Sequence, residues 1–318
     1  MKTYNVVSVS GGKDSTATLL KAIEENAENL VAVMADTGNE HPLTYEYISY
    51  LEQTLGVTIR YVTADFSEAF AHRRAYLDSA KAKRPGRYFW PEEARLRAIE
   101  LMQPTGNPFL DLCMLKGRFP SRKAQFCTDE LKVGPLFAQV QEPLLDGGRN
   151  RVVSWQGIRA NESLSRRDKP MWELDLGDPD SGAGLWLYRP IINWTAEQVF
   201  GYLAERGVRP NPLYLQAMGR VGCMPCINVN KRELREIANR FPEQLKRIEE
   251  WERIVAKVSK HGTATFFASV GGTPNDLITP ETHGVYAKVD WARTVRGGSQ
   301  YDLFQETEAC SSSYGLCE

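Results

Sequence analysis

The residues best suited to chemistry lie near the start of the chain, where an apolar run leads into a loop of glycines, hydroxyls and one lysine. The loop reads Ser10, Gly11, Gly12, Lys13, Asp14, Ser15, and a helical pattern follows it. Glycines let the backbone approach an anion, Lys13 supplies a positive charge, and a helix N-terminus adds N–H groups. The spacing differs from that of the P-loop of kinases. The sequence predicts a polyphosphate site, the alternative being a plain turn before a capped helix.

A second polar segment follows the next apolar run, at Asp36, Thr37 and Gly38. An aspartate at the end of a buried strand can bind Mg²⁺ or a ribose hydroxyl, and the two residues after it form the turn. An ordinary turn is the alternative interpretation.

A third candidate element contains Gly157, Arg159 and Arg166, just after a predicted strand over 151–156. The planar guanidinium of arginine can hold two phosphate oxygens at once. We therefore predict phosphate contacts here, with a solvated basic loop as the alternative.

The cysteines form the other strong pattern. Cys223 and Cys226 are separated by two residues on a Gly/Pro turn, a spacing used for zinc, iron–sulfur clusters and redox pairs. The chain has six cysteines in all. We expect a cytoplasmic protein, in which cysteines serve as metal ligands or redox groups more often than as disulfides.

The elements that must position these residues begin with apolar runs at 6–10, 30–35 and 57–62, separated by helical patterns at 15–26 and 43–55. This order predicts an α/β fold with a parallel sheet, whose ligands lie beyond the carboxyl ends of the strands. Further helices are expected at 194–205, with Thr195 as the cap, and at 231–260, in two parts divided near 241–242. We predict a nucleotide-binding domain over 1–228 and a helical, partly irregular extension over 229–318.

Composition narrows the function classes. The chain has 318 residues, 42% of them hydrophobic, and a net charge of −1. This charge provides no global positive field for nucleic acid. Apolar runs are shorter than the roughly 20 residues that a membrane helix needs, and no leader pattern is visible, so no membrane partner is expected. A local basic and aromatic stretch over 84–90 could bind a nucleic acid or another acidic acceptor.

The loop at 10–15 resembles the pyrophosphate loop of the ATP pyrophosphatases, and the segments at 36–38 and 157–166 resemble those of the phosphoadenylyl-sulfate (PAPS) reductase family. The resemblance covers about two-thirds of the chain. It implies a Rossmann-like, adenine nucleotide alpha-hydrolase-like fold with helices on both faces of the sheet. It also implies that Arg159 reaches the nucleotide phosphates.

The resemblance extends to the iron–sulfur branch of that family, through Cys127 to Leu136, the Asn211-Pro212-Leu213-Tyr214 segment and the Cys223/Cys226 pair. Cys127 matches the first of two adjacent cluster cysteines, and Thr128 stands at the second. Three of four ligands of a 4Fe–4S cluster are therefore implied, with zinc as the rival metal. Cys113, Cys310, Cys317 or an open iron could complete the set.

Lys13 argues for ATP, because reductases acting on activated sulfate typically lack this lysine. The leading hypothesis is an enzyme that uses ATP with Mg²⁺, adenylylates a nucleic-acid or small-molecule acceptor with pyrophosphate release, and assists sulfur transfer from a cysteine desulfurase or thioredoxin-like donor. The predicted catalytic residues are Lys13, Asp14 and Cys317, the last on a tail loosely similar to that of sulfonucleotide reductases. A true sulfonucleotide reductase and a nucleotide-binding module with a structural metal are the alternatives.

Overall fold

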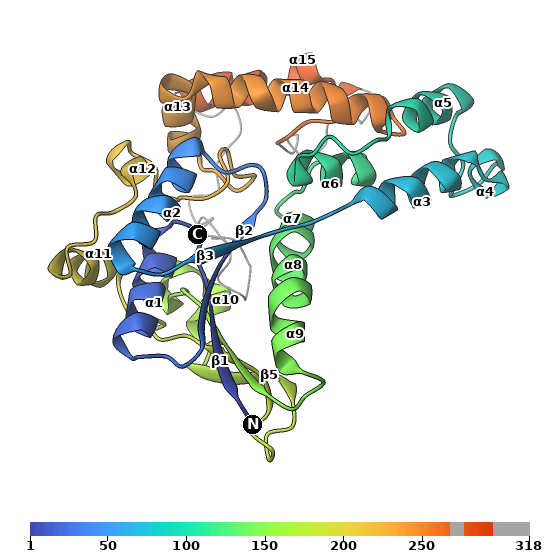
Figure 1. The fold of residues 1–318 in the computed structure, drawn as a ribbon. Helices are drawn as coiled ribbons and strands as arrows, with labels where there is room; N and C mark the ends of the chain where they lie inside the picture. The colour runs from blue at the N-terminus through green and yellow to red at the C-terminus, as the bar shows by residue number, and fades with distance from the viewer. Residues whose placement is uncertain (268–276, 295–318) are drawn as a thin grey trace. The chain divides into compact units, whose positions relative to one another are not determined.

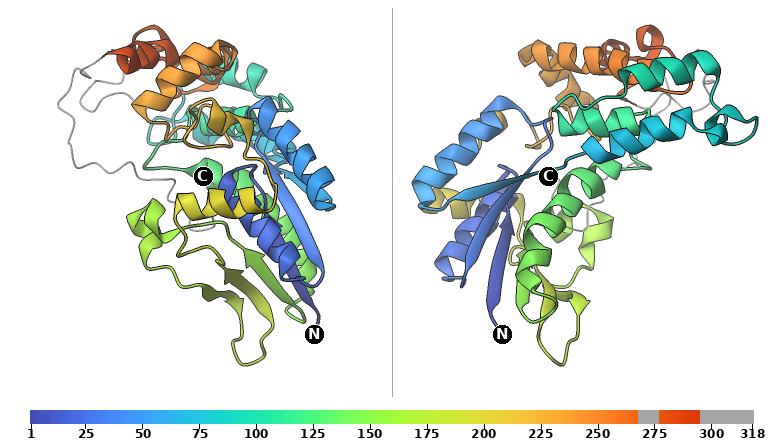
Figure 2. Two further views of the ribbon diagram at one scale, coloured as in Figure 1. Left: turned by 90° about the vertical axis from the view of Figure 1, so that its left-hand side faces the viewer. Right: turned by 45° about the vertical axis from the view of Figure 1, so that its right-hand side comes forward.

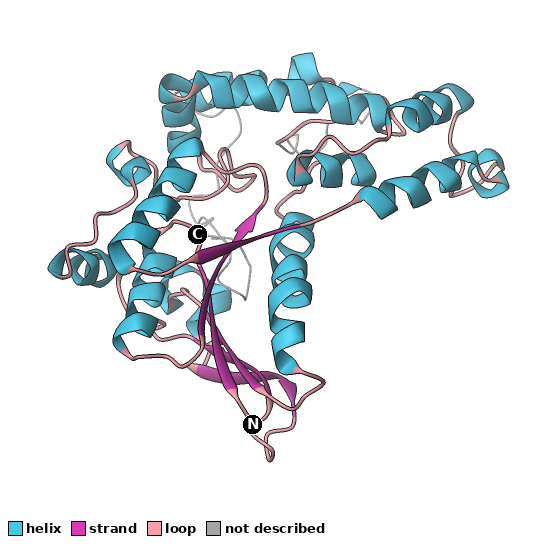
Figure 3. Ribbon diagram, viewed as in Figure 1, coloured by secondary structure: helices cyan, strands magenta, loops and turns pink. Residues whose placement is uncertain are grey.

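In the computed structural model, which describes residues 1–267 and 277–294, six strands form one sheet (Figures 1 and 3). They are β1 (Thr3–Ser8), β2 (Leu30–Asp36), β3 (Ile59–Thr63), β4 (Arg151–Trp155), β5 (Trp172–Gly177) and β6 (Gly184–Tyr188). The strand order is β3-β2-β1-β4-β6-β5, and every pair is parallel except β5 with β6. The predicted α/β fold is confirmed, with one antiparallel edge added.

Helices cover both faces of the sheet. Neighbouring residues of β1 point to opposite faces, so each face contributes to a different core cluster. Val7 packs in a core cluster with residues of α1 (Lys13–Glu24), α2 (Pro42–Leu55) and α11 (Ala196–Glu205). Val6 packs in a second cluster with Leu136, Val140 and Leu145. These three belong to a helical stretch that runs from α7 (Phe126–Thr128) through η1 (Asp129–Val133), α8 (Gly134–Leu136) and η2 (Phe137–Gln141) to α9 (Glu142–Leu145). Figures 1 and 2 show these helices on opposite faces of the sheet.

The chain divides into two compact units. Unit 1 comprises Met1–Ala64 and Thr128–Met224 of the described residues, and it contains the sheet. Unit 2 comprises Asp65–Cys127 and the described residues from Pro225 onward. The domain boundary near residue 228 stays a prediction.

Unit 2 is helical, and an aromatic cluster forms part of its core. Its helices are α3 (Ser67–Asp78), α4 (Ala80–Lys83), α5 (Glu92–Leu101), α6 (Pro108–Lys116), α13 (Lys231–Arg240), α14 (Pro242–Val258), α15 (Pro280–His283) and α16 (Val285–Arg293). Phe109 of α6 stacks on Trp251 of α14 with ring centroids 5.6 Å apart, and Phe266 packs against the same Phe109 ring at 6.0 Å. Stacked and tilted rings at these separations stabilise the fold beyond what the burial of their apolar area contributes.

Several predicted helices are confirmed with their ends. Thr195 caps α11 in a capping box with Gln198, and Phe241 separates α13 from α14, which begins at Pro242. The segment 65–103 forms helices around a Pro/Gly turn. Within the described ranges, no helix is long and apolar enough to cross a membrane.

Candidate functional site

The phosphate loop turns sharply between β1 and α1 at Gly11. This residue has a φ of +80°, a conformation that favours glycine, and a Cβ there would lie 2.9 Å from Thr44 Cγ2. Asn211 Nδ2 donates to the Gly11 carbonyl at 3.1 Å and fixes the turn from the other side. The loop therefore requires glycine at this position.

The two serines of the loop tie it to itself. The hydroxyls of Ser10 and Ser15 lie 3.1 Å apart, and Ser15 Oγ accepts the Ser10 N–H at 3.2 Å and donates to the Gly12 carbonyl at 3.0 Å. Gly12 N donates to Ser10 Oγ at 3.4 Å. These contacts give the serines a structural role in the loop, in addition to any phosphate contact.

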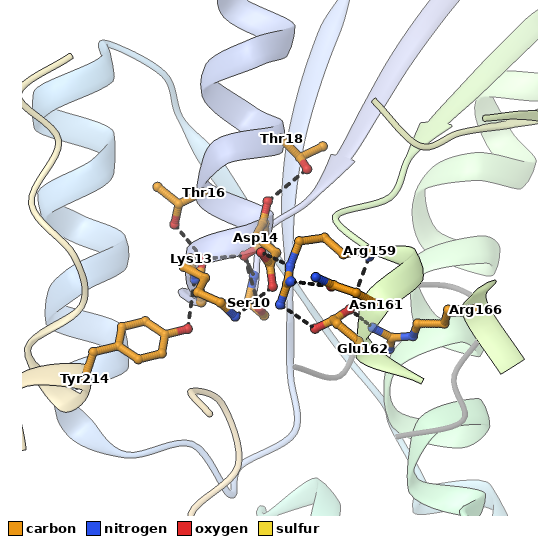
Figure 4. Close-up of polar contacts among 12 residues, drawn as sticks. Ser10, Lys13, Asp14, Thr16, Thr18, Arg159, Asn161, Glu162, Arg166 and Tyr214 are labelled. Atoms are coloured by element: carbon orange, nitrogen blue, oxygen red, sulfur yellow. Dashed lines mark hydrogen bonds and ion pairs between the residues drawn. The ribbon is translucent and has the colours of Figure 1, made fainter. Parts of the chain in front are cut away.

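A buried chain of alternating charges begins at the loop (Figure 4). Asp14 accepts from Lys13 Nζ through Oδ2 and from Arg159 Nε through Oδ1, both at 2.8 Å. Glu162 then pairs with Arg159 Nη2 at 3.4 Å and with Arg166 Nη1. Asp14 is fully buried, and the side chains of Arg159 and Arg166 are 7% and 1% exposed. These contacts gather three cations and two carboxylates beside the phosphate loop.

Gly157 allows the arginine segment to approach the start of α1. A Cβ on Gly157 would lie 2.8 Å from the carbonyl carbon of Asp14 and 2.9 Å from Ser15 N. Because such contacts are shorter than any that Cβ atoms make, only glycine fits without a shift of backbone. The structure thus brings together the loop at 10–15, Gly157, Arg159 and Arg166, which are far apart in sequence.

Tyr214 is a site residue that the sequence motifs did not assign. Its hydroxyl accepts the backbone N–H of Lys13 at 2.9 Å, and its ring centroid lies 5.8 Å from Lys13 Nζ. Phe200 holds the ring edge-on, with centroids 5.4 Å apart. The Asn211–Tyr214 segment contained the signal only as part of a family motif, because nothing local indicates a partner 201 residues away.

The end of β2 forms a second polar cluster. Asp36 Oδ1 accepts from Gly38 N at 2.9 Å and from the Tyr45 hydroxyl at 2.8 Å. Thr37 donates to Glu40 through its hydroxyl at 2.7 Å and through its N–H at 3.1 Å. Burial raises the pKa of Glu40 above its ordinary value, and burial likewise raises the pKa of Tyr45. Tyr45 had no recognisable signal in the sequence.

Cys223 lies against this acidic cluster. Its Sγ atom is 3.6 Å from Glu40 Oε1 and 3.5 Å from Thr37 Oγ1, and the backbones of Cys223 and Glu40 form an antiparallel bridge. Met224 N donates to the Asn39 carbonyl at 2.8 Å. Cys223 therefore lies beside oxygen groups at the β2 edge.

The other predicted metal ligands are placed as follows. Cys226 accepts the Asn228 N–H at 3.5 Å. Cys113 is buried in α6, and burial raises the pKa of its thiol well above the ordinary value, with a further contribution from nearby Cys127. Among the residues that the structure describes, no group of three or more His, Cys, Asp or Glu side chains could hold a metal ion. Cys310 and Cys317 lie outside the described residues.

Comparison with known families adds the decisive observation. Residues 4–229 match the model of the phosphoadenosine phosphosulfate reductase domain. The chain belongs to this family. The family is named for a reaction on an adenine nucleotide, so its members are expected to bind such a nucleotide.

Relatives of this phosphoadenosine phosphosulfate reductase family member include phage proteins and reductases. An uncharacterized 37.8 kDa protein of Escherichia phage 186 is 46% identical, with 99% of this chain and 97% of that protein aligned. A nin-region protein of Escherichia phage lambda is 28% identical over 62% of this chain and 60% of its own length. The adenosine 5′-phosphosulfate reductase of Neisseria meningitidis is 34% identical over 40% of this chain and 49% of that enzyme. A crystal structure of PAPS reductase from Candida auris covers 70% of this chain and 81% of its own, with 17% identity and a TM-score of 0.37.

Proposed function

We propose that this protein binds ATP as its Mg²⁺ complex and transfers the adenylyl group to an acceptor, with release of pyrophosphate. The observation that carries the proposal is the Asp14 carboxylate, which holds Lys13 and Arg159 beside one glycine-rich loop at the start of a helix. Two cations and helix N–H groups at one point suit a polyphosphate better than a single sulfate ester.

In the proposed reaction, a nucleophilic oxygen of the acceptor attacks the α-phosphorus of ATP. The bond from the α-phosphorus to the bridging oxygen breaks, and its electron pair leaves with pyrophosphate. Lys13 offsets the charge that develops on the leaving group, while Arg159 orients the phosphates. The acceptor keeps the adenylyl group as a phosphoester.

The acidic edge of β2 supports a nucleotide without a phosphate on its ribose. Asp36 has a carboxylate at the position where such folds bind ribose hydroxyls, and Glu40 lies beside it, sharing the Tyr45 hydroxyl at 3.5 Å. The Asp36 carboxylate would repel a ribose phosphate, so we expect ATP to bind in preference to PAPS.

The adenylylation test uses purified protein, Mg²⁺ and ATP radiolabelled at the α-phosphate, with pyrophosphate and AMP as products. Removing Lys13 with Lys13→Ala is expected to slow pyrophosphate release about 100-fold or more, the usual effect of losing one transition-state charge contact. Lys21→Ala is the matched control, because Lys21 lies on the same helix and pairs with Glu25 at 2.8 Å, away from the loop. Equal rates for wild type and Lys13→Ala would sink the proposal.

We also propose that the adenylylated acceptor is sulfurated, with the terminal sulfur of a donor persulfide displacing AMP. This displacement joins the acceptor to the donor through a disulfide. A second thiol, on the donor or on a thioredoxin-like protein, then reduces that disulfide, which frees the thiolated acceptor and leaves the two remaining sulfurs joined as a disulfide. The described residues contain no group of three or more His, Cys, Asp or Glu side chains that could hold a metal ion, so the iron–sulfur cluster and its rival zinc stay predictions. No step is assigned to a metal.

The sequence match to an adenosine 5′-phosphosulfate reductase favours a second candidate, thiol-dependent reduction of a sulfonucleotide to sulfite. In that reaction Cys317 would be the nucleophile that takes up the sulfur. Sulfite release from adenosine 5′-phosphosulfate that disappears in Cys317→Ser would select this candidate over adenylylation.

A further inference from the structure

The segment from α4 to the start of α5 gathers positive charge. Between Asp78 and Glu92 the sequence contains no acidic residue. It contains the cations Lys81, Lys83, Arg84 and Arg87. Since the whole chain has a net charge of −1, this concentration is a local feature. Lys83 pairs with Asp78 at 3.0 Å. The other three cations form no ion pair with a carboxylate in the part of the chain that the structure describes.

The segment has a defined shape. Trp90 is buried, and its backbone N–H donates to the Ala82 carbonyl at 2.9 Å. The guanidinium of Arg73 lies over the Trp90 ring, 5.2 Å from its centroid. Phe89 N donates to the Gly86 carbonyl at 3.1 Å, where glycine adopts a φ of +139°. These contacts anchor the loop on unit 2, next to the paired helices α3 and α5 (Figure 1).

Two large aromatic side chains stay outside this anchored loop. Tyr88 is 50% exposed and Phe89 is 37% exposed, although the adjacent Trp90 is 7% exposed. Lys81 Nζ lies 4.4 Å from the Tyr88 ring centroid, and the Arg87 guanidinium lies 5.8 Å from it. The fold thus presents an aromatic ring with cations beside it, which the packing of unit 2 does not need.

We propose that the loop at residues 81–89 binds single-stranded nucleic acid. Unpaired bases stack on exposed aromatic rings, and the phosphates between them bind lysine and arginine. A duplex keeps its bases stacked inside and would use the cations alone. An anionic membrane is a less suitable ligand for this segment. Insertion into a membrane needs bare apolar side chains, whereas Lys81 and Arg87 lie beside the Tyr88 ring. Under the proposed adenylylation, which this extension assumes, the bound strand supplies the acceptor.

The test is fluorescence anisotropy without ATP, using labelled 20-nucleotide dT and U strands and a 20-base-pair duplex. We expect tighter binding of a single strand than of the duplex. Tyr88→Ala should weaken single-strand binding about 10-fold, within the range of base stacking on one ring. Lys81→Ala/Arg87→Ala should weaken it and reduce the slope of log Kd against log salt by about 1.4, the value for two phosphate contacts on a single strand.

The matched control is Arg149→Ala/Lys246→Ala, which removes two exposed cations elsewhere on the surface and should leave binding and slope unchanged. Far-UV circular dichroism verifies that each variant is folded. Absence of binding to any strand in 50 mM salt, equal losses in the control, or tighter binding of anionic vesicles would overturn the proposal. Lys13→Ala should bind strands normally, although it releases pyrophosphate about 100-fold more slowly or worse. A failure of the adenylylation proposal can therefore be distinguished from a failure of the strand-binding proposal. Strands that bind yet never become adenylylated would overturn only their role as acceptor.

Discussion

At the scale of single residues, Asp14 is the organising group of the candidate site. It lies within 2.8 Å of both the Lys13 ammonium and the Arg159 guanidinium. Burial removes most of the hydration of the two cations, and without this carboxylate they would also repel each other with no nearby Asp14 charge to offset that loss. Asp14 therefore holds both cations in place before a nucleotide arrives, so less free energy is spent on orienting them when it binds.

Tyr214 leads to a prediction about nucleotide affinity. Tyr214→Phe keeps the ring beside Lys13 and removes the hydroxyl that accepts the Lys13 N–H. One neutral hydrogen bond contributes about 1 kcal/mol, so we expect the KM for ATP to rise roughly five-fold, with a smaller change in kcat. Pyrophosphate release measured across ATP concentrations tests this split.

The control for Tyr214→Phe is Tyr50→Phe. The Tyr50 hydroxyl also accepts a backbone N–H, from Arg209 at 3.0 Å, but it lies on α2 away from the phosphate loop. We expect Tyr50→Phe to leave KM unchanged. A loss of kcat with constant KM in Tyr214→Phe, or the same change in both variants, would contradict the positioning role.

The sequence identified the site residues whose signal is local and missed those whose signal is a distant partner. The spacing of glycines, hydroxyls and Lys13 marks the loop because adjacent residues build it. Tyr214 gives no such signal, since it acts through a contact with Lys13 from another segment. Arg159 was recognised through a family motif, and its pairing with Asp14 emerges only from the fold.

At the scale of elements, the same reasoning explains which strands and helices could be predicted. β1 and β2 were visible as apolar runs because they lie inside a parallel sheet. β3 was also visible as an apolar run, although it lies at one edge of the sheet. β5 was missed because it is an edge strand with exposed residues and the charged Glu173 and Asp175. The stretch from α7 to α9 was missed because Pro135 and Pro143 lie within it, and proline normally ends a helix.

The junction of α14 and α16 contains a buried carboxyl with an unusual proton affinity. Glu252 is 1% exposed and accepts the N–H groups of Phe266 at 2.6 Å and Val285 at 3.0 Å. Burial raises the pKa of Glu252 from 4.5 to about 7, against the opposing effect of these two bonds. The protonated form is therefore favoured in the folded state.

This shift predicts a pH dependence of stability. In the unfolded chain Glu252 loses its proton near pH 4.5, whereas the folded protein keeps it until about pH 7. Its contribution is present below pH 4.5 and is lost as the pH rises through 7, to an extent of roughly 3 kcal/mol at about 1.4 kcal/mol per pKa unit. Glu252→Gln, which stays neutral, should flatten the fall in unfolding free energy between pH 5 and pH 8.

Urea unfolding at several pH values measures this effect. Glu250→Gln is the control, because Glu250 lies on the same helix and is exposed. We expect the Glu250→Gln curve to stay parallel to that of the wild type. If Glu252→Gln also runs parallel to the wild type, the carboxyl of Glu252 does not titrate in this range.

At the scale of the whole molecule, the proposed chemistry and the Glu252 junction belong to different compact units. Lys13, Asp14, Arg159 and Tyr214 all lie in unit 1, whereas α14 and α16 lie in unit 2. A ligand stabilises the conformation that binds it, by about 2.7 kcal/mol when its concentration is 100 times Kd. Nucleotide binding should therefore protect the backbone amides of unit 1 that surround the loop.

Hydrogen exchange read by mass spectrometry tests this division. With ATP and Mg²⁺ in excess, we expect slower exchange in peptides covering 8–18 and 155–166, because these contain the phosphate loop and the arginine segment. The protection factors of peptides covering α14 and α16, which exclude the intrinsic pH dependence of amide exchange, should fall as the pH rises from 5 to 8 and should not change with ATP, since they follow the protonation of Glu252. Lys13→Ala should abolish the first effect and leave the second. Protection by ATP that appears in α14 and α16 but not at 8–18 would contradict the assignment of the nucleotide to the glycine-rich loop.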